Sequence, residues 1–407
     1  MPVNDLVVNQ ASTILNSLVH QAQGIADLTP TNGGDFVSVA QTALKQGYDP
    51  ILNSMSQMWG RTIFSVRPYS RKFRGLEMDG TRWGNAIRKI SIADKDVVDD
   101  ERFLYPVKYD STQAIPTGDG ISVDMFKLNK PDVLQTNFYG QSVYENDYTI
   151  FRDNLDTAFS GPDEFMRFNA MVAQNRADKL EQYRENIARA LLVNLAGSLV
   201  AEDNSDRVIH VLTEYNTQLG LTGDDALTAE TVYYPDNYKA FIQWLYAKIA
   251  DISNVMTERS EMFQTVINSK HIMRHTPANK QKIYLYSKFM TEIDAMVKSN
   301  TYHDNLLKLA DYESVTFWQS IKTRDSISVR PTYTTDAGLV VTESDPVEVD
   351  HLLGVIFDQE ALGYAQVNAY NALTPFNTHG GFWNDTDHVN FRTLMDITEK
   401  AVVLVLD

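Results

Sequence analysis

The chain has 407 residues, 43% of them hydrophobic and 22% charged, with a net charge of −17 and no cysteine. This balance is typical of a globular protein with room for two or three domains, and the missing cysteine excludes disulfides, thiol nucleophiles and cysteine-bound metals. The acidic total also argues against a chain whose main role is to hold nucleic acid.

The N-terminal region, residues 1–60, has two helical patterns, over 4–22 and from Asp35 to Met58, separated by a loop signal. It is too short for a large core, so we expect it to pack on another surface. Its first ten residues lack the basic and apolar parts of a signal peptide, and no run in the chain reaches the length of a membrane span. We therefore expect a protein without a membrane partner.

Residues 61–135 alternate like strands and are rich in aromatic and β-branched residues. Such a thin apolar stripe does not stand alone in water, so the segment needs a surface to lie on. Within it, residues 61–90 hold eight Lys and Arg against two acidic residues, a net +6 that leaves −23 for the rest of the chain. This basic run with interleaved aromatics would suit either nucleic acid or the acidic body of a neighbouring copy.

A long amphipathic helix is predicted over 163–197. Pro162 and the acidic Asp163 mark its start, and Gly197 is interpreted as its stop. One apolar stripe runs along the helix, and the residues that we expect to pack include Phe165, Phe168, Leu180, Ile187 and Leu191. At 1.5 Å per residue the helix is roughly 50 Å long, which suits a beam across an extended molecule.

An α/β region is predicted from 226 to 374, with a helix over 235–256 and strands at 263–269, 282–287 and 351–358. Residues 375–407 read as two strands, HVNFRTL and AVVLVL, joined by a turn near Asp396. The second of these strands is the best apolar partner for the stripe of the long helix. We therefore expect the helix to lie against a sheet that includes this strand pair.

Patterns that carry chemistry are scarce: the chain has no glycine-rich nucleotide loop, no HExxH and no GxSxG. His271 and His275 stand four apart without an evident third ligand, and the run Asp385–His388 lacks the spacing of a calcium loop. Lys95, beside two aspartates, is best explained as part of a solvated face. We expect no catalytic residue, no metal and no cofactor.

The order of these elements resembles the major capsid proteins of tailed double-stranded-DNA phages, which share the Hong Kong 97-like or Johnson fold. It is most similar to coat proteins of small short-tailed phages of Gram-positive hosts. The residues that carry the resemblance are 138–165 before the long helix, 355–363 (VIFDQEALG) and 380–407 with its AVVLVLD end. The similarity covers nearly the whole chain in element order.

The resemblance implies an α+β fold with five parts: an N-arm (1–60), an extended E-loop hairpin (61–135), a P-domain with a spine helix (136–225), an α/β A-domain (226–374) and C-terminal strands returning to the P-domain (375–407). It implies a non-enzymatic subunit that self-assembles in the host cytoplasm into an icosahedral phage head, and so a virion component. The expected partners are copies of itself in pentamers and hexamers, a portal protein and a separate scaffolding protein. The head would enclose double-stranded DNA without sequence-specific binding.

We expect the basic E-loop residues to contact neighbouring subunits; they are Arg67, Arg71, Lys72, Arg74, Arg82, Arg88 and Lys89. Some family members join subunits through a lysine–asparagine bond, but the sequence places no acid or asparagine opposite Lys72, Lys89 or Lys95. Three alternatives stay open. They are an encapsulin-type nanocompartment shell, an enzyme with a carboxylate site in the α/β region, and a nucleic-acid-binding module built on residues 61–90.

Overall fold

The structure is a computed structural model. It describes residues 69–78, 87–93, 126, 132–159, 161–202, 206–289 and 312–407, with isolated positions between 13 and 52. Most of the N-terminal helical patterns lie outside the described residues, as do Arg67, Arg82 and Lys95.

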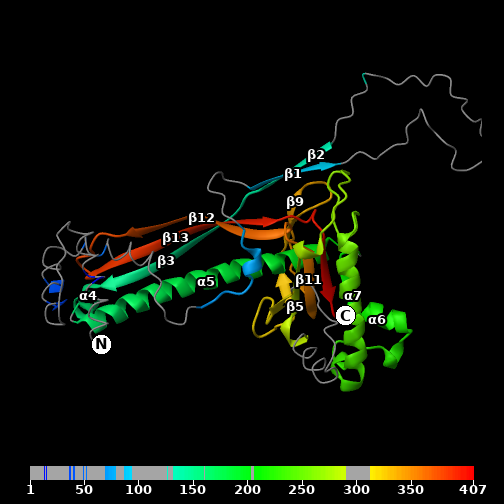
Figure 1. Cartoon of the computed structure of the whole chain (residues 1–407), viewed down its shortest axis with the longest axis horizontal. Helices are drawn as coiled ribbons and strands as arrows, with labels where there is room; N and C mark the ends of the chain where they lie inside the picture. Colours follow the sequence, from blue (N-terminus) through cyan, green and yellow to red (C-terminus); the bar gives the residue numbers. More distant parts are fainter. Residues whose placement is uncertain are drawn as a thin grey trace, which may run out of the picture.

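The longest element is helix α5 (Pro162–Ala201), which has 40 residues and is about 60 Å long at 1.5 Å per residue (Figure 1). It begins with a proline followed by two acidic residues, as expected at the positive end of a helix dipole. The stop expected at Gly197 is wrong, because the helix continues to Ala201. Gly197 serves packing instead: a Cβ there would lie 2.4 Å from Val329 Cγ1.

A three-stranded antiparallel sheet lies along the first part of α5 (Figure 1). Its order is β12 (Leu362–Leu373), β13 (Phe382–Met395) and β3 (Gly140–Phe151). The short helix α4 (Arg152–Ala158) joins β3 to α5. Ile150 and Trp383 from the sheet share a core with Phe165 of the helix. The sheet and the first turns of α5 are therefore two layers packed against each other.

A five-stranded sheet meets the last part of α5, in the order β4-β14-β11-β5-β6. Its strands are β4 (Val208–His210), β14 (Ala401–Val405), β11 (Leu352–Asp358), β5 (Gln281–Tyr286) and β6 (Tyr312–Val315). Helices α6 (Val211–Leu219) and α7 (Pro235–Thr257) cover its other face. In β14, Val403 and Val405 face the core shared with α5, whereas Val402 and Leu404 face α7.

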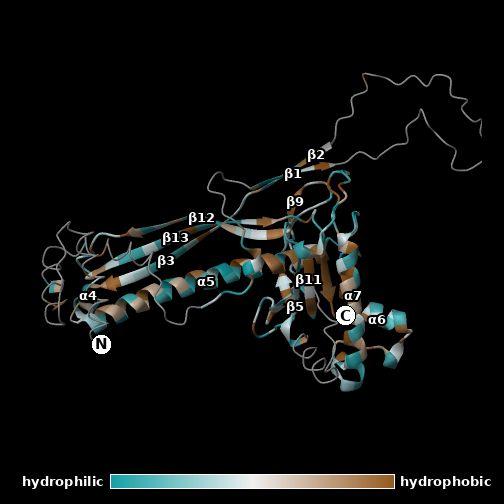
Figure 2. Cartoon of the chain, viewed as in Figure 1, coloured by the Kyte–Doolittle hydropathy of each residue, from teal (hydrophilic) through white to brown (hydrophobic). Residues whose placement is uncertain are grey.

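Burial on both faces explains why β14 reads as an unbroken apolar run. Figure 2 shows the same concentration of hydrophobic residues in the strands around β11. The five residues expected to pack along α5 all lie against a core. Phe165 and Ile187 are buried, and the three partly buried members are Phe168, Leu180 and Leu191.

Three two-stranded ribbons complete the described strands. They are β1 (Ile87–Ala93) with β2 (Asp132–Phe138), β7 (Ile327–Val329) with β10 (Val347–Val349), and β8 (Thr332–Thr334) with β9 (Val340–Thr342). We call β1–β2 the stem, and it projects away from the rest of the molecule (Figure 1). The two larger sheets and the helices packed on them are called the body.

Two expectations about strands need correction. The C-terminal strands exist, but they do not pair with each other: β13 pairs with β12 and β3, whereas β14 pairs with β11 and β4. The strand expected at 263–269 is wrong, because Phe263, Asn268 and Ser269 have positive φ values that fit turns and not a strand.

Candidate functional site

The basic residues expected to act between copies fall into two groups on the described chain. Arg71, Lys72 and Arg74 belong to residues 69–78, which we call the base segment, and Arg88 and Lys89 belong to strand β1. Both groups lie where the chain leaves the body. The contacts at these two places hold the described parts of the predicted E-loop to the body.

The base segment is anchored by buried hydrophobic side chains. Phe73 and Leu76 are both buried in the core that also holds the last part of α5. The ring of Phe73 lies 5.6 Å from that of Tyr284, and the guanidinium of Arg189 lies 5.1 Å from its centroid. The backbone N–H of Met78 donates to the carbonyl oxygen of Tyr364 at 2.8 Å.

Glu185 on α5 receives the polar groups of the base segment. Its carboxylate accepts hydrogen bonds from the Tyr69 hydroxyl at 2.5 Å and the Lys72 backbone N–H at 3.2 Å, and it is paired with Arg189 at 2.8 Å. Burial alone would raise the pKa of Glu185, but these donors outweigh it and lower that pKa. The hydrogen bond to Glu185, with burial and the carboxylate charge, raises the pKa of Tyr69 to about 12.

Arg71 has its ion-pair partners within the same chain. It pairs with Glu77 of the base segment and with Glu181 of α5, the latter at 2.6 Å, and only 8% of its side chain is exposed. Glu181 also pairs with Arg184 at 2.9 Å. The Lys72 ammonium donates to Thr316 Oγ1 at 2.8 Å.

The stem alternates between a face turned to the body and a face turned away. Lys89 and Ser91 reach the body, whereas Ile90 and Ile92 are 58% and 57% exposed. Ile92 is opposite Val133 in the antiparallel register, so these side chains share the outer face. None of the described side chains at 88–92 and 133–138 is buried.

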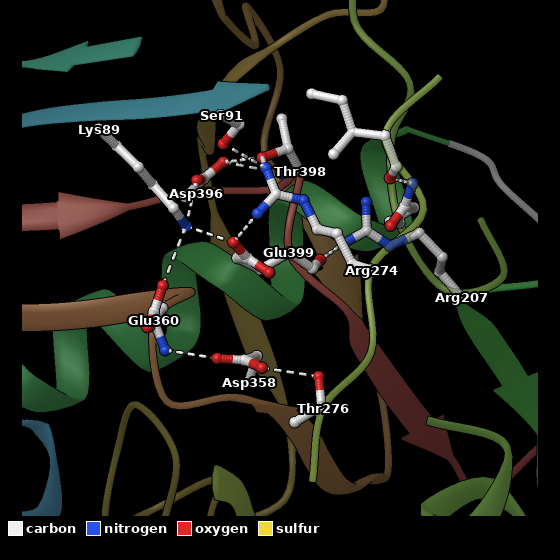
Figure 3. A network of polar contacts seen from close by, with 12 residues as sticks. Lys89, Ser91, Arg207, Arg274, Thr276, Asp358, Glu360, Asp396, Thr398 and Glu399 are labelled. Atoms are coloured by element: carbon white, nitrogen blue, oxygen red, sulfur yellow. Dashed lines mark hydrogen bonds and ion pairs between the residues drawn. The ribbon is translucent and has the colours of Figure 1, made fainter. Parts of the chain in front are cut away.

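The side chain of Lys89 enters a cluster of charged groups in the turn between β13 and β14 (Figure 3). We call this turn, residues 396–400, the receptor turn. The Lys89 ammonium lies 2.9 Å from Asp396 Oδ2, contacts Glu399 Oε1, and lies 3.8 Å from the exposed Glu360. Asp396 is itself oriented by Thr398, whose N–H and hydroxyl donate to Oδ1 at 3.0 and 2.6 Å.

Arg274 contacts both the stem and the receptor turn. It pairs with Glu399 and donates to Thr398 Oγ1 at 3.0 Å and to Ser91 Oγ at 3.1 Å (Figure 3). Beneath the turn, the fully buried Arg207 pairs with Glu202 at 2.9 Å and donates to the carbonyl oxygen of Ala401 at 3.2 Å. Burial lowers the pKa of Arg207 to about 10.

The ionisation of the cluster follows from its mixed charges. Burial disfavours the charged form of Lys89, but Asp396 and Glu399 outweigh it and raise the pKa of the lysine. Burial likewise opposes ionisation of Asp396, yet Lys89 and the Thr398 donors lower the pKa of that carboxyl. For Glu399, burial prevails over Lys89 and Arg274 and raises the pKa. The Lys89–Asp396 contact is therefore an ion pair.

Sequence reasoning missed most of this cluster. Arg207, Arg274, Asp396 and Glu399 lie in or beside turns, where charged residues are usually solvated. The one available signal is the run Asp396–Lys400 between two apolar strands, and it reads equally well as an exposed turn. Of the predicted residues, the structure brings only Lys89 to the cluster. Arg74 bonds Ser70 at 2.8 Å, and Arg88 lies on the exposed side of β1.

Asp385, Asp387 and His271, which the sequence analysis also singled out, have structural partners. Arg176 of α5 pairs with Asp385 at 2.7 Å and with Asp387 at 2.5 Å, so the acidic run on β13 holds the sheet to the helix. His271 contacts Glu261 at 2.7 Å. Among the residues that the structure describes, no group of three or more His, Asp or Glu could hold a metal ion, and no helix is long and apolar enough to cross a membrane.

The described chain combines a long helix under an elongated sheet, a second sheet with helices, and a projecting stem. Residues 12–405 match the family described as Phi29-like phage major capsid protein. The match spans almost the whole chain, so the chain belongs to this family. It is a major capsid protein of a tailed phage, with the Hong Kong 97-like fold, and a component of the virion.

Similar chains are found among solved structures. A chain from the structure of the head fiber and inner core protein gp22 of native bacteriophage P68 matches at 11% identity with a TM-score of 0.52, covering 85% of this chain and 87% of that one. A chain of the capsid structure of Staphylococcus phage Andhra matches at 12% identity with a TM-score of 0.49, with the same two coverages. No curated protein matches the chain. The family match gives no support to the encapsulin alternative.

Proposed function

We propose that copies of this chain assemble as pentamers and hexamers into an icosahedral head around double-stranded DNA, in the host cytoplasm, without catalysing a reaction. The supporting observation is the stem, whose outer face carries exposed Ile90, Ile92 and Val133 and which buries none of its described side chains on its own body. Exposed apolar side chains grouped on a projecting ribbon mark a contact surface.

In this proposal the chain divides into an N-arm (1–60), an E-loop (61–135), a P-domain (136–225), an A-domain (226–374) and closing C-terminal strands (375–407). The described part of the E-loop consists mainly of the base segment and most of the stem. Its outer face lies against a neighbouring copy, with Arg88 at its edge. A portal protein and a separate scaffolding protein are the other proposed partners.

The base segment gives the E-loop a fixed origin. Arg71 is already paired with acidic groups of its own chain, which leaves Lys72, Arg74 and Arg88 as the exposed basic residues predicted to contact neighbours in the described part. The role of all the basic E-loop residues between copies stays a prediction. Their charges steer the encounter of subunits more than they add affinity.

The test is the double variant Ile90→Asp/Ile92→Asp. Both side chains are exposed, so the free subunit should keep its stability within about 0.5 kcal/mol. Shells should no longer form from the purified protein with its scaffolding partner, as seen by electron microscopy. Leu219→Asp is the matched control, because Leu219 is 54% exposed on α6, and it should assemble. Normal shells from the double variant would contradict the assignment of the stem face.

A further inference from the structure

Polar groups attach the stem to the body at three places among the residues described. Lys89 enters the receptor turn, Ser91 accepts a hydrogen bond from Arg274, and the Lys270 ammonium donates to the carbonyl oxygen of Val133 at 2.5 Å. No described stem side chain from 88–92 or 133–138 is buried. Detaching the stem therefore exposes little apolar surface, and apolar burial is the term that normally makes a contact permanent.

The receptor turn keeps its own partners when Lys89 is taken away. Asp396 remains bonded to the N–H and hydroxyl of Thr398, and Glu399 remains paired with Arg274. Arg207 still holds the turn from below through backbone carbonyl oxygens. The lysine can be hydrated once outside, whereas the buried Asp396 Oδ2, which faces Lys89 and has no other partner among the described residues, then requires water. This cost favours the closed state.

One exposed residue joins the stem to the three-stranded sheet of the body. Tyr139 is the single residue between β2 and β3, and it is 69% exposed. The next residue, Gly140, is fixed against β13, because a Cβ on it would lie 2.1 Å from Thr393 Oγ1. The rigid sheet thus begins immediately after Tyr139.

We propose that Lys89 and the receptor turn form a salt-dependent latch that sets the direction of the stem, and that the stem turns about Tyr139 when the latch opens. The groups that face the lysine are Asp396, Glu399, Glu360 and, across Glu399, Arg274. In the closed state the stem is held in one orientation, and in the open state it is free to meet a neighbour at another angle. That consequence rests on the proposed assembly, whereas the latch itself belongs to the free subunit.

This geometry favours salt concentration, and not pH, as the condition that opens the latch. Asp396 has a lowered pKa, so its ionised form persists until the pH falls below its ordinary value of 3.8. Lys89 has a raised pKa, so its charge persists until the pH rises above its ordinary value of 10.5. The ion pair is therefore intact throughout the neutral range. Lys89 is partly exposed at 18%, so dissolved ions can compete for it.

The absence of cysteine allows the latch to be measured cleanly. Cysteines placed at exposed Gln135 on the stem and exposed Asp251 on α7 would carry two spin labels on an otherwise thiol-free chain. Pulsed electron paramagnetic resonance of the free subunit then reports the distribution of label distances. At low salt we expect one narrow peak.

The latch predicts that this narrow peak is lost in two independent ways. Lys89→Met should broaden the distribution at low salt, and about 1 M salt, where the Debye length is about 3 Å, should broaden it in the labelled protein with Lys89 intact. Arg88→Met is the matched control on the other face of the same strand, and it should keep the narrow peak. The thermal unfolding midpoint of each variant shows whether the body is folded.

A narrow, unshifted peak in folded Lys89→Met would overturn the proposal, and so would an unshifted peak in 1 M salt. If Lys89→Met does not fold, the salt titration decides alone. Shell formation by the same proteins is followed separately by electron microscopy. A subunit that forms no shells still reports the state of its latch, so failure of the assembly proposal is distinguishable from failure of the latch.

Discussion

The base segment and the stem both belong to the proposed E-loop, yet they are attached to the body in different ways. The base segment buries Phe73 and Leu76, and around them it adds an ion pair to Glu181 and hydrogen bonds to Glu185. The stem buries no described side chain, and one lysine provides its main contact. An attachment with an apolar centre resists salt and water, whereas a polar attachment depends on both. The comparison predicts a fixed origin and an adjustable direction.

The largest expected effect is at the apolar centre. Phe73→Ala removes a buried aromatic ring that contacts Tyr284 and Arg189, and it should lower the free energy of unfolding by about 3–5 kcal/mol. Chemical denaturation measures the change. Arg74→Ala, at the exposed neighbouring residue, should change it by less than about 0.5 kcal/mol. Equal small effects from both variants would show that the base segment is no better anchored than the stem.

A smaller effect is expected where the base segment meets Glu185. Tyr69→Phe removes one hydrogen bond to that carboxylate and should cost about 0.5–1.5 kcal/mol at neutral pH. The raised pKa of Tyr69 adds a dependence on pH, because a phenol with a folded pKa of about 12 and an ordinary value of 10.0 favours the folded state only while it is protonated. Its contribution is complete below pH 10.0 and is lost as the pH rises toward about 12.

Denaturation of both proteins across this alkaline range tests the point. The difference in unfolding free energy between the normal chain and Tyr69→Phe should shrink as the pH rises, because the variant has no phenol to titrate. The chain has 20 tyrosines. Comparing the two proteins removes the effect of those other than Tyr69. A difference that stays constant up to pH 12 would mean that Tyr69 is not bonded to Glu185 in solution.

The fold was predictable where a local pattern decides it. The apolar stripe of α5 identified the helix, but Gly197 was misinterpreted because its reason is the approach of Val329, which lies far along the chain. The run of β14 identified a strand without identifying its neighbours. Its partners β11 and β4 are fixed by the two layers that cover it, and these are not visible in the run itself.

The site was predictable only in part, for a related reason. The net +6 of residues 61–90 predicted an acidic partner, which we expected on a neighbouring copy. It did not indicate that the acids facing Arg71 and Lys89 include Glu181 and Glu399 of the same chain, more than a hundred residues away. Charge patterns in one sequence predict the sign of a partner and leave its position open. Whether the exposed Arg74 and Arg88 also meet a neighbouring copy stays a prediction.

The smallest expected effect is an unchanged mass. It distinguishes a permanent covalent attachment of the stem from an adjustable ionic one. The amine of Lys89 lies 2.9 Å from a carboxyl oxygen of Asp396, near enough to raise the question of a covalent bond. In such a bond the lysine nitrogen would attack the carboxyl carbon, an amide would form, and one water would leave. The reaction requires a neutral amine and a protonated carboxyl, because an ammonium has no free electron pair and a carboxylate resists attack.

The environment favours the ammonium form of Lys89 and the carboxylate form of Asp396. The neighbouring carboxylates raise the pKa of Lys89, and the lysine together with Thr398 lowers the pKa of Asp396, in each case against the effect of burial. Proximity therefore produces an ion pair and no bond. In the folded subunit, and in subunits recovered from shells, the peptides that carry Lys89 and Asp396 should be found as separate species with no water lost. A mass lower by one water, mapped by peptide analysis to Lys89 and Asp396, would make the stem's attachment permanent and contradict the latch.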